Sequence, residues 1–342
     1  MSNSRIRQRR ADSRTSGIRI VLLLVFLAAL VCAFFLLRMR NDGTYALDQP
    51  YDLQKQNGAE QLSEFSQQTA DPFAGELITV EGDVIPKGVS LPQDDCKALL
   101  FDLENGEAVY ARRVYQKVYP ASLTKMMTAI LALENASLNE TVTMSKSDFD
   151  LEEGSQVSAL EVGDTLTMDT LFHLLVIYSA NDAAMAIART VGGDVPHFVE
   201  MMNERAKELG MTGTHFTNPT GLHDPEMVTT PYDVYLMMRQ AYSYQRYLNV
   251  SQMAEYTAEA VGSDGIKRTF YHASTDQYLT LERTLPADMR ILASKTGTTD
   301  QAGSCLALVV QNEYGVPYIA IVMGAWDKDL LYGNMTTLLE MT

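Results

Sequence analysis

The stretch "YPASLTKMMTAILALE", residues 119–134, joins a polar start to a run of apolar residues with helical spacing. This spacing predicts a largely buried helix that begins near Ser122. Positions i and i+3 share one face of a helix, so Ser122 and Lys125 are expected to lie side by side at its start. The pair has two interpretations: a helix cap followed by a solvated cation, or a nucleophile with its base.

The rest of the ordered region predicts strands on both sides of a helical middle. A hairpin is predicted over 97–113, where two apolar runs flank Asn105 and Gly106. Further helices are predicted over 167–193 with a break at "YSAND", over 194–210, over 230–242 and over 329–341. Further strands are predicted over 290–297, 303–311 and 316–325. We therefore expect an α+β domain in which the first hairpin and the last three strands form one antiparallel sheet, flanked by helices and a helical lobe.

The N-terminal segment is predicted to be a membrane anchor. Residues 20–37 are eighteen residues without a charge, which as a helix would be about 27 Å long, close to the thickness of a bilayer's hydrocarbon core. Six arginines precede it and Arg38 and Arg40 follow it, which favours a cytoplasmic tail at 1–19 and an exported remainder. A cleaved signal peptide is the alternative, but the apolar run is long and no small-x-small cleavage site follows.

An acidic stretch follows the anchor. Residues 41–95 carry eleven Asp and Glu against two Lys, which is typical of a solvated spacer. We therefore assign 38–94 to an extracytoplasmic stalk and 95–342 to a folded domain. The net charge of the 342-residue chain is −16, which makes nucleic acid an unsuitable partner.

The cysteines and histidines predict neither a disulfide framework nor a metal site. The three cysteines are Cys32, Cys96 and Cys305, and the last two are expected to be buried free thiols, with a pairing between them as the alternative. The five histidines include no HExxH motif, so no metal and no cofactor are expected.

The stretch "YSAN", residues 178–181, lies at the predicted helix break. Short polar residues at such a break can simply satisfy backbone groups. Alternatively, Ser179 could relay a proton and Asn181 could hold an amide of a substrate.

The stretch "SKTGTT", residues 294–299, ends a predicted strand. Lys295 can be read as a protective charge on an edge strand. Alternatively, Lys295 with the hydroxyls of Thr296 and Thr298 suits a carboxylate, and Gly297 allows a ligand close to the backbone.

The order SxxK, SxN and KTG in an exported chain resembles the penicillin-recognising serine hydrolases. The segments 119–134, 163–188, 202–225 and 294–310 resemble more specifically the serine D-alanyl-D-alanine carboxypeptidases. This resemblance implies a β-lactamase/transpeptidase-like fold with a five-stranded antiparallel sheet. It also implies an enzyme that removes the terminal D-alanine from peptidoglycan stem peptides and is acylated by β-lactam antibiotics.

The resemblance also implies roles for the motif residues. Ser122 would be the acylated nucleophile, Lys125 its general base and Ser179 a proton relay, and Lys295 would keep Lys125 neutral and attract a carboxylate. The substrate-binding set would be Asn181, Thr296, Gly297 and Thr298, with the backbone N–H groups of Ser122 and Thr298 as the oxyanion hole.

The sequence departs from the family pattern at two points, and other functions are therefore considered as alternatives. Only about 45 residues follow Gly297, so the further β-rich domain of many members is expected to be absent. No arginine follows Arg290, where members often supply one that helps hold the carboxylate. A class A-like β-lactamase is disfavoured because "THFTNPTGL" carries no glutamate, and a catalytically weak wall-binding or morphogenetic protein is the second alternative. A D,D-endopeptidase would use the same residues.

Overall fold

A computed structural model of the protein describes residues 82–342. These residues belong to one compact unit, Thr69–Thr342. The predicted tail at 1–19, the predicted anchor at 20–37 and most of the predicted stalk at 38–94 lie outside the described residues. Among residues 82–342, no helix has the length and apolar character needed to cross a membrane.

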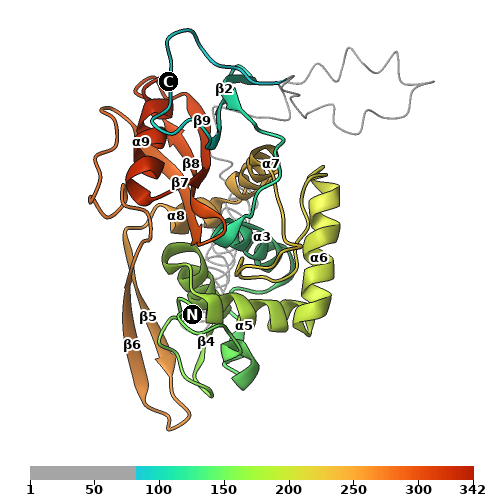
Figure 1. The fold of residues 1–342 in the computed structure, drawn as a ribbon. Helices are drawn as coiled ribbons and strands as arrows, with labels where there is room; N and C mark the ends of the chain where they lie inside the picture. Colours follow the sequence, from blue (N-terminus) through green and yellow to red (C-terminus); the bar gives the residue numbers. More distant parts are fainter. Residues whose placement is uncertain (1–81) are drawn as a thin grey trace, which may run out of the picture. The chain divides into compact units, whose positions relative to one another are not determined.

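The described part of the chain begins with two strands, continues through a mainly helical middle that contains two short strands, and ends with five strands and one helix (Figure 1). The strands are β1 (Lys97–Asp102), β2 (Glu107–Arg112), β3 (Thr141–Thr143), β4 (Thr165–Thr167), β5 (Glu255–Val261), β6 (Lys267–Ala273), β7 (Arg290–Thr299), β8 (Gly303–Gln311) and β9 (Pro317–Ala325). The helices and helical turns are η1 (Ala121–Thr124), α3 (Lys125–Asn135), η2 (Lys146–Phe149), α4 (Met168–His173), η3 (Leu174–Tyr178), α5 (Asn181–Gly192), α6 (Val195–Glu208), α7 (Pro231–Tyr242), α8 (Gln245–Ser251) and α9 (Lys328–Leu339).

The main sheet has five strands in the order β2-β1-β9-β8-β7. All neighbours pair antiparallel, and Ala320 of β9 lies between Leu100 of β1 and Leu308 of β8. The predicted sheet of the first hairpin and the last three strands is therefore confirmed. In this order β7, which carries the KTG motif, is an edge strand.

Each face of this sheet packs against its own apolar core. Successive side chains of a strand point to opposite faces, so Leu99 and Phe101 enter one core and Leu100 enters the other. The first core also contains α3, α5, α7 and α8, whereas the second is closed by Leu331, Met335 and Leu338 of α9. Helices therefore flank both faces of the sheet.

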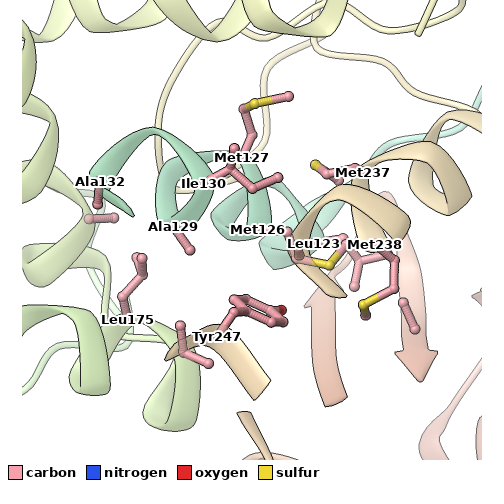
Figure 2. Close-up of a cluster of buried hydrophobic side chains, with 14 of the residues drawn as sticks. Leu123, Met126, Met127, Ala129, Ile130, Ala132, Leu175, Met237, Met238 and Tyr247 are labelled. Atoms are coloured by element: carbon pink, nitrogen blue, oxygen red, sulfur yellow. The ribbon is translucent and has the colours of Figure 1, made fainter. Parts of the chain in front are cut away.

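Helix α3 is the centre of the first core. Its residues from Lys125 to Ala132 are buried without interruption, so it contacts protein on all sides over its first two turns. Figure 2 shows side chains of α3 together with Met238 of α7 and Tyr247 of α8 in this cluster. The helix that begins at Lys125 therefore has a fixed position in the fold.

A second sheet has four strands in the order β3-β4-β5-β6. Sequence analysis predicted a helical lobe beside the main sheet, with no strands in it. The second sheet corrects this prediction. The strands β3 and β4 have only three residues each, too few for an alternating pattern to be recognised. The longer hairpin of β5 and β6 did carry a signal, Asp264 and Gly265 between two β-rich runs.

Both described cysteines are free and buried, as expected. Cys305 belongs to the first core and Cys96 to the second.

The residues just before β1 are attached to the rest of the fold at two points. Val84 pairs with Ala111 of β2, and the amide N–H of Gln93 donates to Asn334 Oδ1 of α9 at 3.0 Å.

Candidate active site

Ser122 lies in the short turn η1 directly before α3. Its side chain does not cap the helix, because neither η1 nor α3 has a side-chain cap hydrogen bond at its start. The preceding residue, Ala121, has a φ of 47°, a left-handed conformation that costs of order 1–3 kcal/mol in a residue with a Cβ. The interpretation of Ser122 as an ordinary helix cap is therefore wrong.

Lys125 is 1% exposed and its Nζ lies near three oxygen atoms. These are Ser122 Oγ at 2.9 Å, Asn181 Oδ1 at 2.7 Å and the carbonyl oxygen of Thr220 at 2.6 Å. The last two can only accept a hydrogen bond. A neutral amine has two N–H bonds, which Asn181 and Thr220 take up, so its lone pair is left for the hydroxyl of Ser122.

The electrostatic surroundings favour this neutral form. Burial holds the pKa of Lys125 well below its usual range, and the nearby charge of Lys295 lowers this pKa further, while Asp182 opposes the shift. An ammonium group loses most of its hydration when it is buried, so the uncharged form is favoured. The interpretation of Lys125 as a solvated surface cation is therefore wrong.

The carbonyl of Thr220 belongs to a loop that is stabilised by hydrogen bonds within the loop. Asn218 Oδ1 accepts hydrogen bonds from the amides of Thr220 and Gly221 at 3.1 and 2.8 Å. Thr128 of α3 ties the loop to the helix, because its hydroxyl donates to the carbonyl of Pro219 at 2.7 Å. Sequence analysis did not identify Thr220 as a partner of Lys125, since a backbone carbonyl has no signature in the sequence.

Ser179 lies at the predicted helix break, which the structure forms as a single π-helical turn, η3, before α5. Ser179 ends this turn with φ 64° and ψ 33°. π-turns and left-handed residues of this kind occur often at functional sites. The break turns the hydroxyl of Ser179 toward β7 and places Asn181 at the start of α5, toward Lys125.

Lys295 connects strand β7, which carries the KTG motif, to the helix break at Ser179. It is 2% exposed, and its Nζ donates to Ser179 Oγ and to the carbonyl of Thr296, both at 2.8 Å. Burial lowers the pKa of Lys295 to about 7, and the carboxylate of Asp276 opposes this shift. The interpretation of Lys295 as a protective charge on an exposed edge is therefore wrong.

Gly297 lets β7 approach the turn that carries Ser122. A Cβ at this position would lie 2.9 Å from the backbone nitrogen of Ser122 and 3.1 Å from that of Leu123. Real side chains essentially never come so close, so only glycine fits without displacing the turn. Sequence analysis expected this glycine to admit a ligand, whereas the close neighbour in the structure is the chain's own turn.

The two threonines of this strand differ in exposure. Thr296 is half-buried and its hydroxyl lies 2.5 Å from that of Thr275, whereas Thr298 is exposed. The structure therefore joins Ser122 and Asn181 to Lys125 and joins Ser179 to Lys295 by hydrogen bonds. The two groups are near enough for the charge of Lys295 to lower the pKa of Lys125, and the remaining predicted residues follow Lys295 along β7.

Asp276 is a buried acid near the site that sequence analysis did not single out. It is 1% exposed, and its carboxylate accepts from Ser294 Oγ at 2.5 Å, from Tyr332 OH at 3.0 Å and from the amide of Tyr278 at 3.0 Å. Burial raises the pKa of Asp276, and these hydrogen bonds oppose the shift. The acid thus lies beside β7 at the residue that precedes Lys295.

The part of the chain from residue 82 onward has no group of three or more His, Cys, Asp or Glu placed to hold a metal ion. The polar group described above consists of hydroxyl, amine, amide and carbonyl groups. It defines a serine–lysine centre, buried between a helix start and the edge of an antiparallel sheet.

Comparison with known proteins identifies the family. The family model described as D-alanyl-D-alanine carboxypeptidase matches residues 88–327. The chain therefore belongs to this peptidase family, as its motifs suggested.

Curated relatives and a solved structure are similar to this chain over most of its length. D-alanyl-D-alanine carboxypeptidase DacF of Bacillus subtilis is 28% identical over 71% of this chain and 60% of its own length. A D-alanyl-D-alanine endopeptidase of Pseudomonas aeruginosa is 28% identical over 70% of this chain and 74% of its own length. The crystal structure of the DD-transpeptidase of a Streptomyces strain has a TM-score of 0.68 and 25% identity, and the match covers 74% of this chain and 98% of that one.

The relatives that match are longer than the matched region. The match spans 60–62% of the length of the carboxypeptidases from Bacillus subtilis, Haemophilus influenzae and Escherichia coli. The chain therefore spans about three fifths of the length of these relatives.

Proposed function

We propose that this protein is a serine D-alanyl-D-alanine carboxypeptidase that cleaves the terminal peptide bond of peptidoglycan stem peptides and is acylated by penicillins. The observation that carries the proposal is the pairing of Ser122 Oγ with Lys125 Nζ at 2.9 Å, in surroundings that lower the pKa of the amine and favour its neutral form. A serine hydroxyl becomes an effective nucleophile when a base lies within hydrogen-bond reach.

In the proposed acylation step, Ser122 Oγ bonds to the carbonyl carbon between the two D-alanines, and its proton passes to Lys125 Nζ. The bond to the leaving nitrogen then breaks, and that nitrogen receives a proton through Ser179 Oγ. The free D-alanine leaves, and an ester links the acyl part to Ser122. Water hydrolyses this ester in the second half of the reaction, and its proton is taken by the same base.

The substrate carboxylate would lie at the Lys295 end of β7. The ammonium form of Lys295 supplies positive charge there, and the hydroxyls of Thr296 and Thr298 can donate to the carboxylate oxygens. Asn181 is held by Lys125 through Oδ1, so its Nδ2 is the group that would donate to the carbonyl of the acyl segment.

The developing oxyanion would be held by the backbone N–H groups of Ser122 and Thr298. The close approach at Gly297 supports this arrangement, since it fixes β7 against the turn of Ser122. Donors placed in this way contribute about 3–4 kcal/mol each to transition-state stabilisation.

The proposed location is outside the cytoplasmic membrane, with the helix at 20–37 as a single-pass anchor, residues 1–19 in the cytoplasm and the acidic stretch at 38–94 as a spacer. The charge pattern of the N-terminal segment supports this topology. The proposed partners are peptidoglycan stem peptides, β-lactam inhibitors and the membrane.

The function is tested with a fluorescent penicillin and a pentapeptide that ends in D-Ala-D-Ala. The wild-type protein should be labelled covalently and should release D-alanine, whereas Ser122→Ala should do neither. Ser137→Ala, an exposed serine at the end of α3, is the matched control and should behave as the wild type. Labelling of Ser122→Ala would show that the nucleophile is a different residue.

Two other outcomes would identify the alternatives. Rapid turnover of a chromogenic cephalosporin without a long-lived acyl-enzyme would identify a β-lactamase. Correct folding with penicillin labelling but no D-alanine release from any pentapeptide would identify a catalytically weak wall-binding protein.

A further inference from the structure

The backbone on both sides of Ser179 is held by one residue of another segment, Gln156. The amide N–H of Asn181 donates to the carbonyl oxygen of Gln156 at 2.8 Å, and Gln156 Nε2 donates to the carbonyl oxygen of Tyr178. Ser179 between them has a left-handed conformation, which persists only where the surrounding contacts determine it. The orientation of Ser179 therefore depends on the position of Gln156.

Gln156 belongs to the irregular segment 153–160, which is anchored at Ser158. Ser158 is buried, and its amide N–H and its hydroxyl donate to the carboxylate of Asp182 in α5 at 3.0 and 2.6 Å. The carbonyl oxygen of Ser158 lies 3.1 Å from Nε2 of His272 in β6. A carbonyl can only accept a hydrogen bond, so Nε2 of His272 carries the proton.

His272 is buried and also contacts the helix break itself. Its ring packs against the ring of Tyr178, with the centroids 4.3 Å apart. Strand β6, the outer strand of the second sheet (Figure 1), is fixed relative to the break. Two residues beyond its end, the amide of Thr275 donates to the carbonyl of Ile177 in η3 at 3.2 Å. A single buried imidazole therefore contacts both the break and the segment that supports it.

We propose that His272 is a positioning residue, which keeps Ser179 Oγ beside Lys295 Nζ at the observed distance of 2.8 Å. His272 acts through Ser158 and through the ring of Tyr178, and takes no part in the chemistry. The inference rests on the proposed function, in which the hydroxyl of Ser179 passes a proton to the leaving nitrogen. A displacement of about 1 Å in such a group costs up to about 10²-fold in rate.

The effect is expected at Ser179 more than at Asn181. Asn181 is the first residue of α5, a helix whose buried face packs in the first core and fixes the backbone there. Ser179 lies outside the regular helix, in the break itself. Loss of the support from His272 should therefore displace the proton relay first.

The test is a double-mutant cycle of His272→Phe and Ser179→Ala, measured as the limiting rate of acylation by fluorescent penicillin. Phenylalanine keeps a ring against Tyr178 but cannot donate to Ser158. His272→Phe should slow acylation by about tenfold or more when Ser179 is present, and by less than about twofold in the Ser179→Ala background. Equal slowing in the two backgrounds would overturn the proposal.

A second variant separates positioning from a role in folding. Glutamine in His272→Gln keeps an N–H donor of similar reach, so this variant should acylate within about threefold of the wild-type rate. Rates are expressed per molecule that penicillin finally labels, so loss of folded protein does not count as slow acylation. His272→Gln as slow as His272→Phe would contradict the proposal. The matched control is His197→Phe, at an exposed position in α6, which should acylate at the wild-type rate.

The same measurements separate this inference from the proposed function. Release of D-alanine by the wild-type protein together with equal slowing in the two backgrounds would overturn the role of His272 alone. Labelling without release of D-alanine would overturn the proposed carboxypeptidase, and the mutant cycle would still decide the role of His272. A wild-type protein that penicillin does not label would overturn both.

Discussion

Gly221 lies so close to Ala121 that a Cβ on Gly221 would be 1.9 Å from the carbonyl oxygen of Ala121. Gly221 belongs to the loop whose Thr220 carbonyl accepts from Lys125, and Ala121 precedes Ser122. This contact therefore fixes the loop that binds the proposed base against the turn that carries the proposed nucleophile.

Gly221→Ala is expected to disturb both stability and acylation. The new methyl group cannot share space with the Ala121 carbonyl, and the φ of 82° at this position is also unfavourable for alanine. We expect a loss of more than about 3 kcal/mol in the free energy of unfolding and slower labelling by penicillin. Urea unfolding and labelling kinetics measure these effects.

The matched control is Gly193→Ala at the end of α5. Its φ is 80° and its ψ is −37°, but a Cβ there would have no heavy atom within 4 Å, so only the backbone cost of about 1–3 kcal/mol remains. Equal losses in the two variants would show that the contact with Ala121 has no importance of its own.

Lys125→Met is expected to abolish fast acylation while the protein stays folded. The methionine fills a similar volume but cannot take the proton of Ser122, so labelling by penicillin should slow by about 10²–10⁴-fold. Lys146→Met, at an exposed position in η2, should label at the wild-type rate. Normal labelling of Lys125→Met would exclude Lys125 as the base.

Lys295→Met is expected to stabilise the protein in a pH-dependent way. The folded-state pKa of Lys295 is about 7, below the usual value of about 10.4 in an unfolded chain. Between these values the unfolded state binds more protons, so the stability of the wild-type protein rises with pH in this window. The gain of the variant should be largest below about pH 7, up to about 5 kcal/mol, and should shrink toward pH 10.

Urea unfolding of both proteins at several pH values measures this gain. Lys267→Met, at an exposed position on β6, should show no such trend. A gain for Lys295→Met that is constant with pH would mean that the folded protein does not depress the pKa of Lys295.

Asp276→Asn is expected to shift the pH profile of acylation. The carboxylate of Asp276 raises the pKa of Lys295, so its loss should let Lys295 lose its proton at lower pH. The alkaline decline in the labelling rate should then move to lower pH. Asparagine keeps acceptors for Tyr332 and Tyr278, which limits the structural change.

Glu282→Gln is the control, because it removes an exposed charge six residues along the same segment. Its profile should match the wild-type one. A lower labelling rate in Asp276→Asn with an unmoved profile would assign Asp276 a structural role instead.

The main sheet and most helices could be predicted from the sequence because their patterns are local. The hairpin around Asn105 and Gly106, the helix after Ser122 and the last three strands all combine clear periodicity with turn residues. The three-residue strands β3 and β4 have no room for such a pattern. The π-turn at Ser179 was predicted only as a break, because its geometry depends on packing.

The side chains of the candidate site could largely be predicted from the sequence, whereas its backbone groups could not. Ser122 and Lys125 are three positions apart on one helical face. The stretches "YSAN" and "SKTGTT" each allowed a structural or a functional interpretation, and the family resemblance favoured the functional one. The carbonyl of Thr220 was not predictable, since every residue has one. Asp276 was missed because it lies in an irregular segment, where only the fold brings it to Ser294 and Tyr332.

The strand order of the main sheet determines when the protein can first become active during synthesis. Lys97 at the start of β1 pairs with Met323 of β9, and β7 reaches β1 only through β8 and β9. A growing chain therefore has an incomplete sheet and an open β1 edge, which is a risk for aggregation, until residue 325 has been made and has left the ribosome. An antibiotic that acylates Ser122 should consequently label finished chains and leave nascent ones untouched.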